Sequence, residues 1–112
     1  MASKQRMHRD QLSLNVLVED ARRGTRIGHV VDLSISGLGV SGHREMLEPV
    51  GDTELDLVLP WPMHGQERIR LDVRRSWLKE VDGRCHAGFR IVACSDEGQL
   101  ALEHLSARFA DA

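Results

Sequence analysis

Apolar and polar residues alternate along most of this chain, and no other feature limits its fold as strongly. Every second residue from 55 to 59 is leucine, and in residues 68–78 Ile69, Leu71 and Val73 alternate with arginine and aspartate. Successive side chains of a β-strand point to opposite faces of the sheet, so this period of two predicts strands with one buried face. By this pattern or by their β-branched residues, further strands are expected over residues 12–18, 25–31, 38–40, 53–59 and 86–92.

Short connections favour antiparallel pairing of these strands. Val81-Asp82-Gly83 contains the Asp-Gly pair that is typical of a tight hairpin. Pro60–Gly65 is predicted to be a hairpin loop, because its two prolines lack the backbone donor that a central strand requires. Residues 41–52 are predicted to be a looser, charged connection. The expected fold is mainly β, with six antiparallel strands closed, or nearly closed, into a barrel.

One segment, residues 95–109, has the spacing of an α-helix. Ser95 or Asp96 can cap its N-terminus, and Leu102, Leu105 and Phe109 form an apolar stripe at helical intervals. A stripe of this kind is typical of a helix that packs on a sheet. We therefore expect a C-terminal α-helix that buries this stripe against the strands.

The composition is that of one globular domain. The chain has 112 residues, 41% of them apolar, and a formal net charge of -2. We expect a flexible basic arm over residues 1–11 and a single domain over residues 12–112. A charge so close to neutral argues against binding to DNA or RNA. Without a long apolar run or signal stretch, the protein is expected to be cytoplasmic, without membrane insertion, and Cys85 and Cys94 to be reduced packing residues.

The common catalytic and metal-binding motifs are absent from the sequence. It contains no Gly-x-Ser-x-Gly elbow, no phosphate-binding loop and no His-Glu-x-x-His. The six histidines are scattered singly rather than at the spacing of metal ligands. We therefore expect neither catalysis, nor a metal centre, nor a cofactor.

The segment Asp32-Leu33-Ser34-Ile35-Ser36-Gly37 is the best candidate for part of a binding site. It separates two predicted strands, so its ends are fixed. Asp32 and Ser34 can accept hydrogen bonds from the backbone amides of the turn, and Gly37 permits a positive φ and the close approach of a ligand. The same residue types are also typical of an ordinary turn, which remains the alternative.

A basic cluster precedes the first predicted strand. Lys4, Arg6 and Arg9 lie among the first nine residues, which contain no acid. A guanidinium group presents a planar fork of donors that suits phosphate oxygens and the O6/N7 edge of guanine. If this arm folds back across the barrel, its arginines would face the Asp32–Gly37 turn. The alternative is a terminus that is merely solvated.

With these residues, the sequence resembles the PilZ domain family over nearly the whole chain. Members of this family are bacterial receptors for cyclic di-GMP. Asp32, Ser34 and Gly37 fit the family's Asp/Asn-x-Ser-x-x-Gly motif, and Val73–Trp77 and His86–Ile91 resemble its two late strands. The resemblance implies a six-stranded antiparallel PilZ-type β-barrel with a terminal helix. It also implies that cyclic di-GMP binds on the outer surface, at Asp32, Ser34 and Gly37 and at the arm.

The arm matches the family pattern in part. Arg9 corresponds to the second arginine of the family's Arg-x-x-x-Arg motif, whereas the first falls on Gln5, with Arg6 one place later. Gln5 can hydrogen-bond a base but brings no charge. The loss of one fork from a phosphate or guanine costs about 1–3 kcal/mol, which Arg6 would offset if it reaches the same place.

Two functions follow from the resemblance. The first is a cyclic di-GMP receptor whose arm changes conformation on binding and so alters its contacts with an unidentified protein partner. The second is a degenerate adaptor that no longer binds the nucleotide and acts through protein contacts. We expect Trp77 to pack against the terminal helix, with stacking on a guanine as the alternative, and Trp61 to be more exposed and a candidate for partner contacts.

Overall fold

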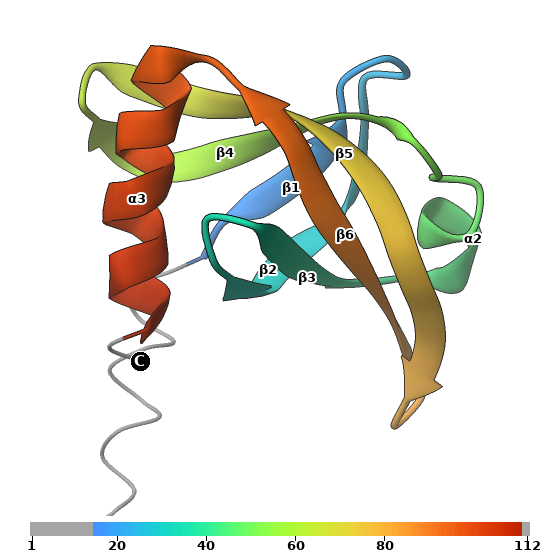
Figure 1. Ribbon diagram of the computed structural model, residues 1–112. Coiled ribbons are helices and arrows are strands. Elements are labelled where there is room, and N and C mark those ends of the chain that lie inside the picture. The colour runs from blue at the N-terminus through green and yellow to red at the C-terminus, as the bar shows by residue number, and fades with distance from the viewer. Residues whose placement is uncertain (1–14, 111–112) are drawn as a thin grey trace, which may run out of the picture.

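The computed structural model describes residues 15–110 of the chain. The predicted arm over residues 1–11, with Gln5, Arg6 and Arg9, lies outside the described residues. The elements are β1 (Leu17–Asp20), β2 (Thr25–Leu33), β3 (Gly37–Gly42), α2 (Arg44–Leu47), β4 (Thr53–Met63), β5 (Gln66–Val81), β6 (Arg84–Cys94) and α3 (Asp96–Ala110) (Figure 1).

The six strands form a closed barrel in the order β1-β2-β3-β6-β5-β4. Every neighbouring pair is antiparallel, and β1 closes the ring by pairing with both β2 and β4. The predicted fold class, a six-stranded antiparallel barrel with a C-terminal helix, is confirmed. The Asp82–Gly83 turn is also confirmed, because both residues have positive φ, at 52° and 80°, as a two-residue hairpin requires.

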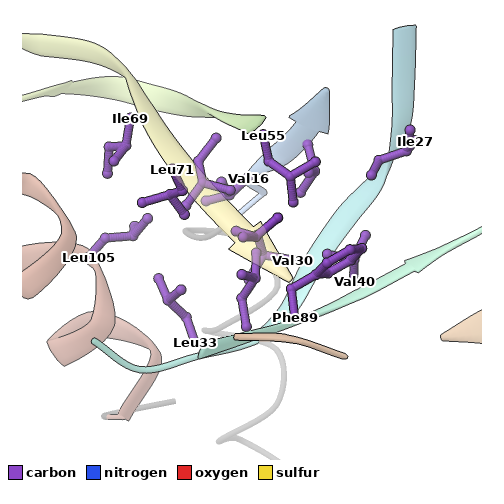
Figure 2. Packing of buried hydrophobic residues seen from close by; sticks show 14 of the residues in the cluster. Val16, Ile27, Val30, Leu33, Val40, Leu55, Ile69, Leu71, Phe89 and Leu105 are labelled. Carbon is purple, nitrogen blue, oxygen red and sulfur yellow. The ribbon is translucent and has the colours of Figure 1, made fainter. Parts of the chain in front are cut away.

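The inward-facing residues of the alternating strands form one core. Leu55, Leu57, Ile69 and Leu71 are fully buried, and Leu105 reaches from α3 toward the strands (Figure 2). The helix packs across β2, β4 and β5. Its expected stripe is confirmed for Leu102 and Leu105, which are fully buried, and Phe109 packs against the core while partly exposed.

The prediction of a loop over Pro60–Gly65 is wrong in its extent, because β4 continues to Met63. The register between β4 and β5 jumps from Val58 paired with Arg68 to Met63 paired with Gln66. The two prolines lie within this jump, where no ladder donor is required of them. The turn itself has only two residues, His64 and Gly65, with positive φ of 51° and 76°.

The connection over residues 41–52 contains the short helix α2, which the sequence pattern does not predict. Four residues are too few to display a helical period. The helix is held instead by long-range contacts. Leu47 is fully buried, and Arg75 on β5 donates from Nη1 to the carbonyl oxygens of Leu47 and Glu48, at 3.4 and 2.8 Å.

Candidate functional site

Four residues from four neighbouring strands stand in one row across the outside of the barrel. Asp32 on β2 is paired with Gly39 on β3, Gly39 with Gly88 on β6, and Gly88 with Trp77 on β5. Neighbouring strands lie about 4.8 Å apart, so the row spans roughly 14 Å. The two central positions have no side chain. The row therefore consists of a carboxylate at one end, an indole at the other and bare backbone between them.

The Trp77 indole lies on the backbone of Gly88. A Cβ added to Gly88 would fall on Cε2 and Nε1 of this ring, closer than real contacts allow. The ring is nevertheless 44% exposed. The sequence predicts that Trp77 packs against the terminal helix, but its ring lies on β6. The first turn of α3, at Gly98, approaches β5 beside Ile69, eight residues and roughly 26 Å away along the strand.

Trp61 is less exposed than Trp77, contrary to the expectation that it would be the more exposed of the two. Its exposed fraction is 37%, and the Arg108 guanidinium of α3 lies over the ring, 4.9 Å from its centroid. The cation covers the ring because the end of β4 packs beside α3.

The turn that joins β2 and β3 is organised by Ser34. Its Oγ accepts hydrogen bonds from the amides of Ser36 and Gly37, at 3.3 and 3.2 Å. Its own amide donates to the Gly37 carbonyl oxygen at 2.9 Å. Ser34 therefore has the turn-forming role expected of it and holds the start of β3 in place.

Asp32 does not take part in the turn. Among the hydrogen bonds within residues 15–110, none involves its carboxylate, and the side chain is exposed on β2. The expectation that Asp32 binds turn amides is therefore not met, because the residue still belongs to the strand and points outward opposite Gly39. Its Cβ lies beside Gly39 on β3.

Gly37 is needed for a different reason from the one expected. It is not among the residues with positive φ in the described part of the chain. A Cβ at this position would lie 2.9 Å from the Phe89 carbonyl oxygen on β6. Glycine therefore allows β3 to approach β6 closely, beside the site.

These residues line one shallow hollow of about 250 Å³. Asp32, Ser34, Gly37 and Trp77, all predicted site residues, border it together. Cofactors and drug-sized ligands occupy pockets of about 300–1,000 Å³, so this hollow would hold one ring or group of a larger ligand. The other lining residues are Leu38, Gly39, Ser76, Gly88 and Phe89.

Two arginines follow in the next outward-facing row. Arg90 on β6 is paired with Gly37 on one side and with Arg74 on β5 on the other. Both side chains are exposed, and within the described part of the chain Arg74 has one ion pair, a distant one with the exposed Asp52 at 4.0 Å. Like charges directly opposite each other repel, so an anion placed beside the hollow would be stabilised there.

Sequence reasoning missed Gly39, Gly88 and Arg90. The Gly88-Phe89 pair is visible in the sequence, but its relation to Asp32 depends on the register between β3 and β6. That register joins strands separated by two others in sequence, and it is set by packing of the whole barrel. Likewise, a role for the outward-facing Arg90 in the site cannot be inferred from the sequence until its neighbours are known.

No group of three or more histidine, cysteine, aspartate or glutamate side chains among residues 15–110 is arranged to hold a metal ion. Within the same range, no helix is both long and apolar enough to cross a bilayer. Cys85 and Cys94 are free thiols, the first buried in the core and the second half-buried.

Comparison with known proteins gives a structural match only. No family model and no curated protein matches this sequence. The solved structure of the Bacillus subtilis inhibitor of motility (MotI/DgrA) is similar, with a TM-score of 0.55 and 15% sequence identity. The match covers 85% of this chain and 45% of that one, so this chain spans less than half its length. At this identity the similarity bears on the fold alone.

Proposed function

We propose that this protein is a cytoplasmic, non-catalytic receptor domain for cyclic di-GMP, which passes the signal on through contacts with a protein partner. The observation that carries the proposal is the hollow that Asp32, Ser34, Gly37 and Trp77 border together. The first three fit the PilZ motif in the sequence, and Trp77 lies three strands away from Asp32 and two from Gly37.

The hollow has the chemistry to hold one guanine. Guanine presents N–H donors at N1 and N2, which the exposed Asp32 carboxylate can accept. A base over the Gly39–Gly88 backbone would meet the Trp77 indole, and stacking on an aromatic ring is worth about 1–3 kcal/mol per base. Because neither glycine has a side chain, a flat ring could approach the sheet closely.

The phosphates would lie outside the hollow. Arg90 and Arg74 supply two positive charges in the adjacent row. In the proposal, Arg9 and Arg6 of the arm hold the second guanine and the phosphates from the opposite side, and Gln5 contributes a hydrogen bond. Ordering of the arm on binding would then change the surface that a partner contacts.

Titration of the full chain with cyclic di-GMP tests the proposal. We expect saturable heat of binding, with amide shifts at Gly37, Gly39 and Gly88, and a loss of about tenfold in affinity for Arg9→Ala, since one charge-assisted fork is removed. Arg22→Gln, which removes an arginine from the exposed β1–β2 turn, is the matched control and should bind normally. No heat and no shifts at high ligand concentration would refute the receptor.

Replacing Gln5 with arginine tests the arm. If Gln5 weakens the arm, Gln5→Arg restores a second fork and should tighten cyclic di-GMP binding by about tenfold. The same titration measures the effect, and Gln5→Lys shows how much of it comes from charge alone. Unchanged affinity would mean that Arg6 already occupies that place.

A second candidate is an adaptor that works through protein contacts without the nucleotide. Gln5 favours it, as do two exposed apolar side chains at the site, Val31 at 44% and Ile35 at 56%. Exposed apolar residues next to a polar turn are common at partner-binding surfaces. The cyclic di-GMP titration separates the two functions, because only the receptor gives saturable binding.

A further inference from the structure

A second hollow, of about 180 Å³, lies elsewhere on the barrel and is bordered by basic side chains. Its polar side chains are Arg26 and His29 from β2, His43 beside α2, and Arg84 from β6. No acid borders it. It shares no lining residue with the hollow at Asp32 and Trp77, and no part of the proposed function uses it.

Backbone geometry forms the floor of this hollow. Gly28 on β2 and Gly42 on β3 both border it, and β2 and β3 approach so closely there that neither position has room for a Cβ. Leu17, Ile27 and Met46 complete the lining. The floor is therefore apolar and rigid, and the charge comes from the rim.

Arg84 is held in place over the sheet. Its Nε donates to Ser41 Oγ at 3.2 Å, and Ser41 is one of only three buried polar or charged residues in the described chain. One nitrogen of the fork is thereby fixed, and the remaining guanidinium donors are available to a ligand. A positioned fork loses less entropy on binding an anion than a free one does.

Three acids near this rim are bound to other arginines, whereas Glu45 on α2 forms no ion pair among the described residues. Glu19 is paired with Arg26 across β1 and β2, but its carboxylate binds Arg68 at 2.7 Å. Glu80, from β5, binds Arg44 at 3.3 Å, as does Glu48 at 3.4 Å. Glu45 on α2 and Lys79 on β5 are the other charged groups close by, and both are exposed. The rim thus keeps its positive charge.

The pKa of His29 is affected by this excess of positive charge. Burial, with the charges of Arg84 and His86 added to it, lowers the pKa of the His29 imidazole. His86 lies on the far side of Ser41, which is paired with both histidines. An anion in the hollow would offset the two neighbouring charges, so its binding and the protonation of His29 should favour each other.

We propose that this hollow binds a small phosphate-bearing anion, held by the guanidinium groups of Arg26 and Arg84 and by the imidazole of His29. Pockets for cofactors and drug-sized ligands begin at about 300 Å³, so the ligand is a phosphate group and not a whole nucleotide. Planar forks suit phosphate oxygens, and neutral His29 can gain a proton as the anion arrives.

Titration with inorganic phosphate at constant ionic strength, followed by NMR, tests the site. We expect saturable shifts at Gly28, Gly42 and His29. With sulfate, whose charge is constant over the range, binding should be tighter below the ordinary histidine pKa of about 6.5 than above it. Phosphate should raise the pKa of His29, because the anion offsets the positive charges that lower it. Glycerol phosphate in place of phosphate distinguishes a monoester ligand from the free ion, and acetate distinguishes a carboxylate ligand.

Variants locate the binding. Arg84→Gln should weaken phosphate binding by at least about tenfold, whereas Arg22→Gln, the same change on the β1–β2 turn, should leave it unchanged. If Arg84→Gln does not fold, Arg26→Gln, at an exposed position, replaces it. The proposal fails if the phosphate-induced shifts grow linearly with concentration, as non-specific shifts in a chloride control would, or if they centre on Gly37 and Arg90. It also fails if acetate binds as well as phosphate, or if the folded arginine variant binds phosphate normally. None of these outcomes depends on cyclic di-GMP.

Discussion

Replacing Gly42 with alanine is expected to destabilise the protein by about 3 kcal/mol, the largest stability effect among the changes considered. A Cβ at this position would collide with the Ile27 carbonyl oxygen on β2, which is backbone and cannot rotate away. Strands β2 and β3 would have to separate where both border the core. Overpacking of this kind costs about 1–3 kcal/mol and sometimes more. Chemical denaturation measures the change.

Gly51→Ala is the matched control. A Cβ at Gly51 has no neighbour within 4 Å, and the residue is not among those with positive φ. We expect its free energy of unfolding to stay within about 0.5 kcal/mol of the original, or to rise slightly because alanine restricts the unfolded chain. Equal stability of the Gly42→Ala and Gly51→Ala variants would contradict the close approach of β2 and β3.

Replacing Gly88 with alanine is expected to lower the affinity for cyclic di-GMP by about 1–3 kcal/mol, which is five- to 150-fold. The new methyl group would occupy the place of the Trp77 indole. Because the ring is 44% exposed, it can turn outward, so stability should fall by no more than about 1 kcal/mol. The ring would then no longer border the hollow, and a guanine would lose its stacking partner.

Fluorescence and a double variant separate the steps of this prediction. In a Trp61→Phe background the emission reports Trp77 alone, since the chain has two tryptophans. Gly88→Ala should shift that emission to longer wavelength even without ligand. Trp77→Ala and the double variant should lose as much affinity as Gly88→Ala, because all three remove one stack. Additive losses would contradict the placement of the ring.

The barrel and the turn could be predicted from the sequence, but the hollow could not. Alternation at residues 53–59 and 68–78 reflects burial on one face, a local pattern that survives in the structure. The pairing of Gly39 with Gly88 depends on strands brought together by the closure of the ring. The helix α2 could not be predicted for the same reason, because Arg75, far along the chain, binds its last carbonyl groups.

Closure of the ring has a consequence for any partner protein. Each of the six described strands is hydrogen-bonded to two neighbours over part of its length, but β5 beyond Val73 is paired with β6 alone and keeps one free side. Where β4 departs from β5 near its end, Pro60 and Pro62 remove amide donors that another strand would need. A partner could therefore add a strand only at such a stretch, where one side of a strand is unpaired. Elsewhere on the barrel it must recognise side chains, and its specificity there can change through surface substitutions that leave the backbone pairing intact.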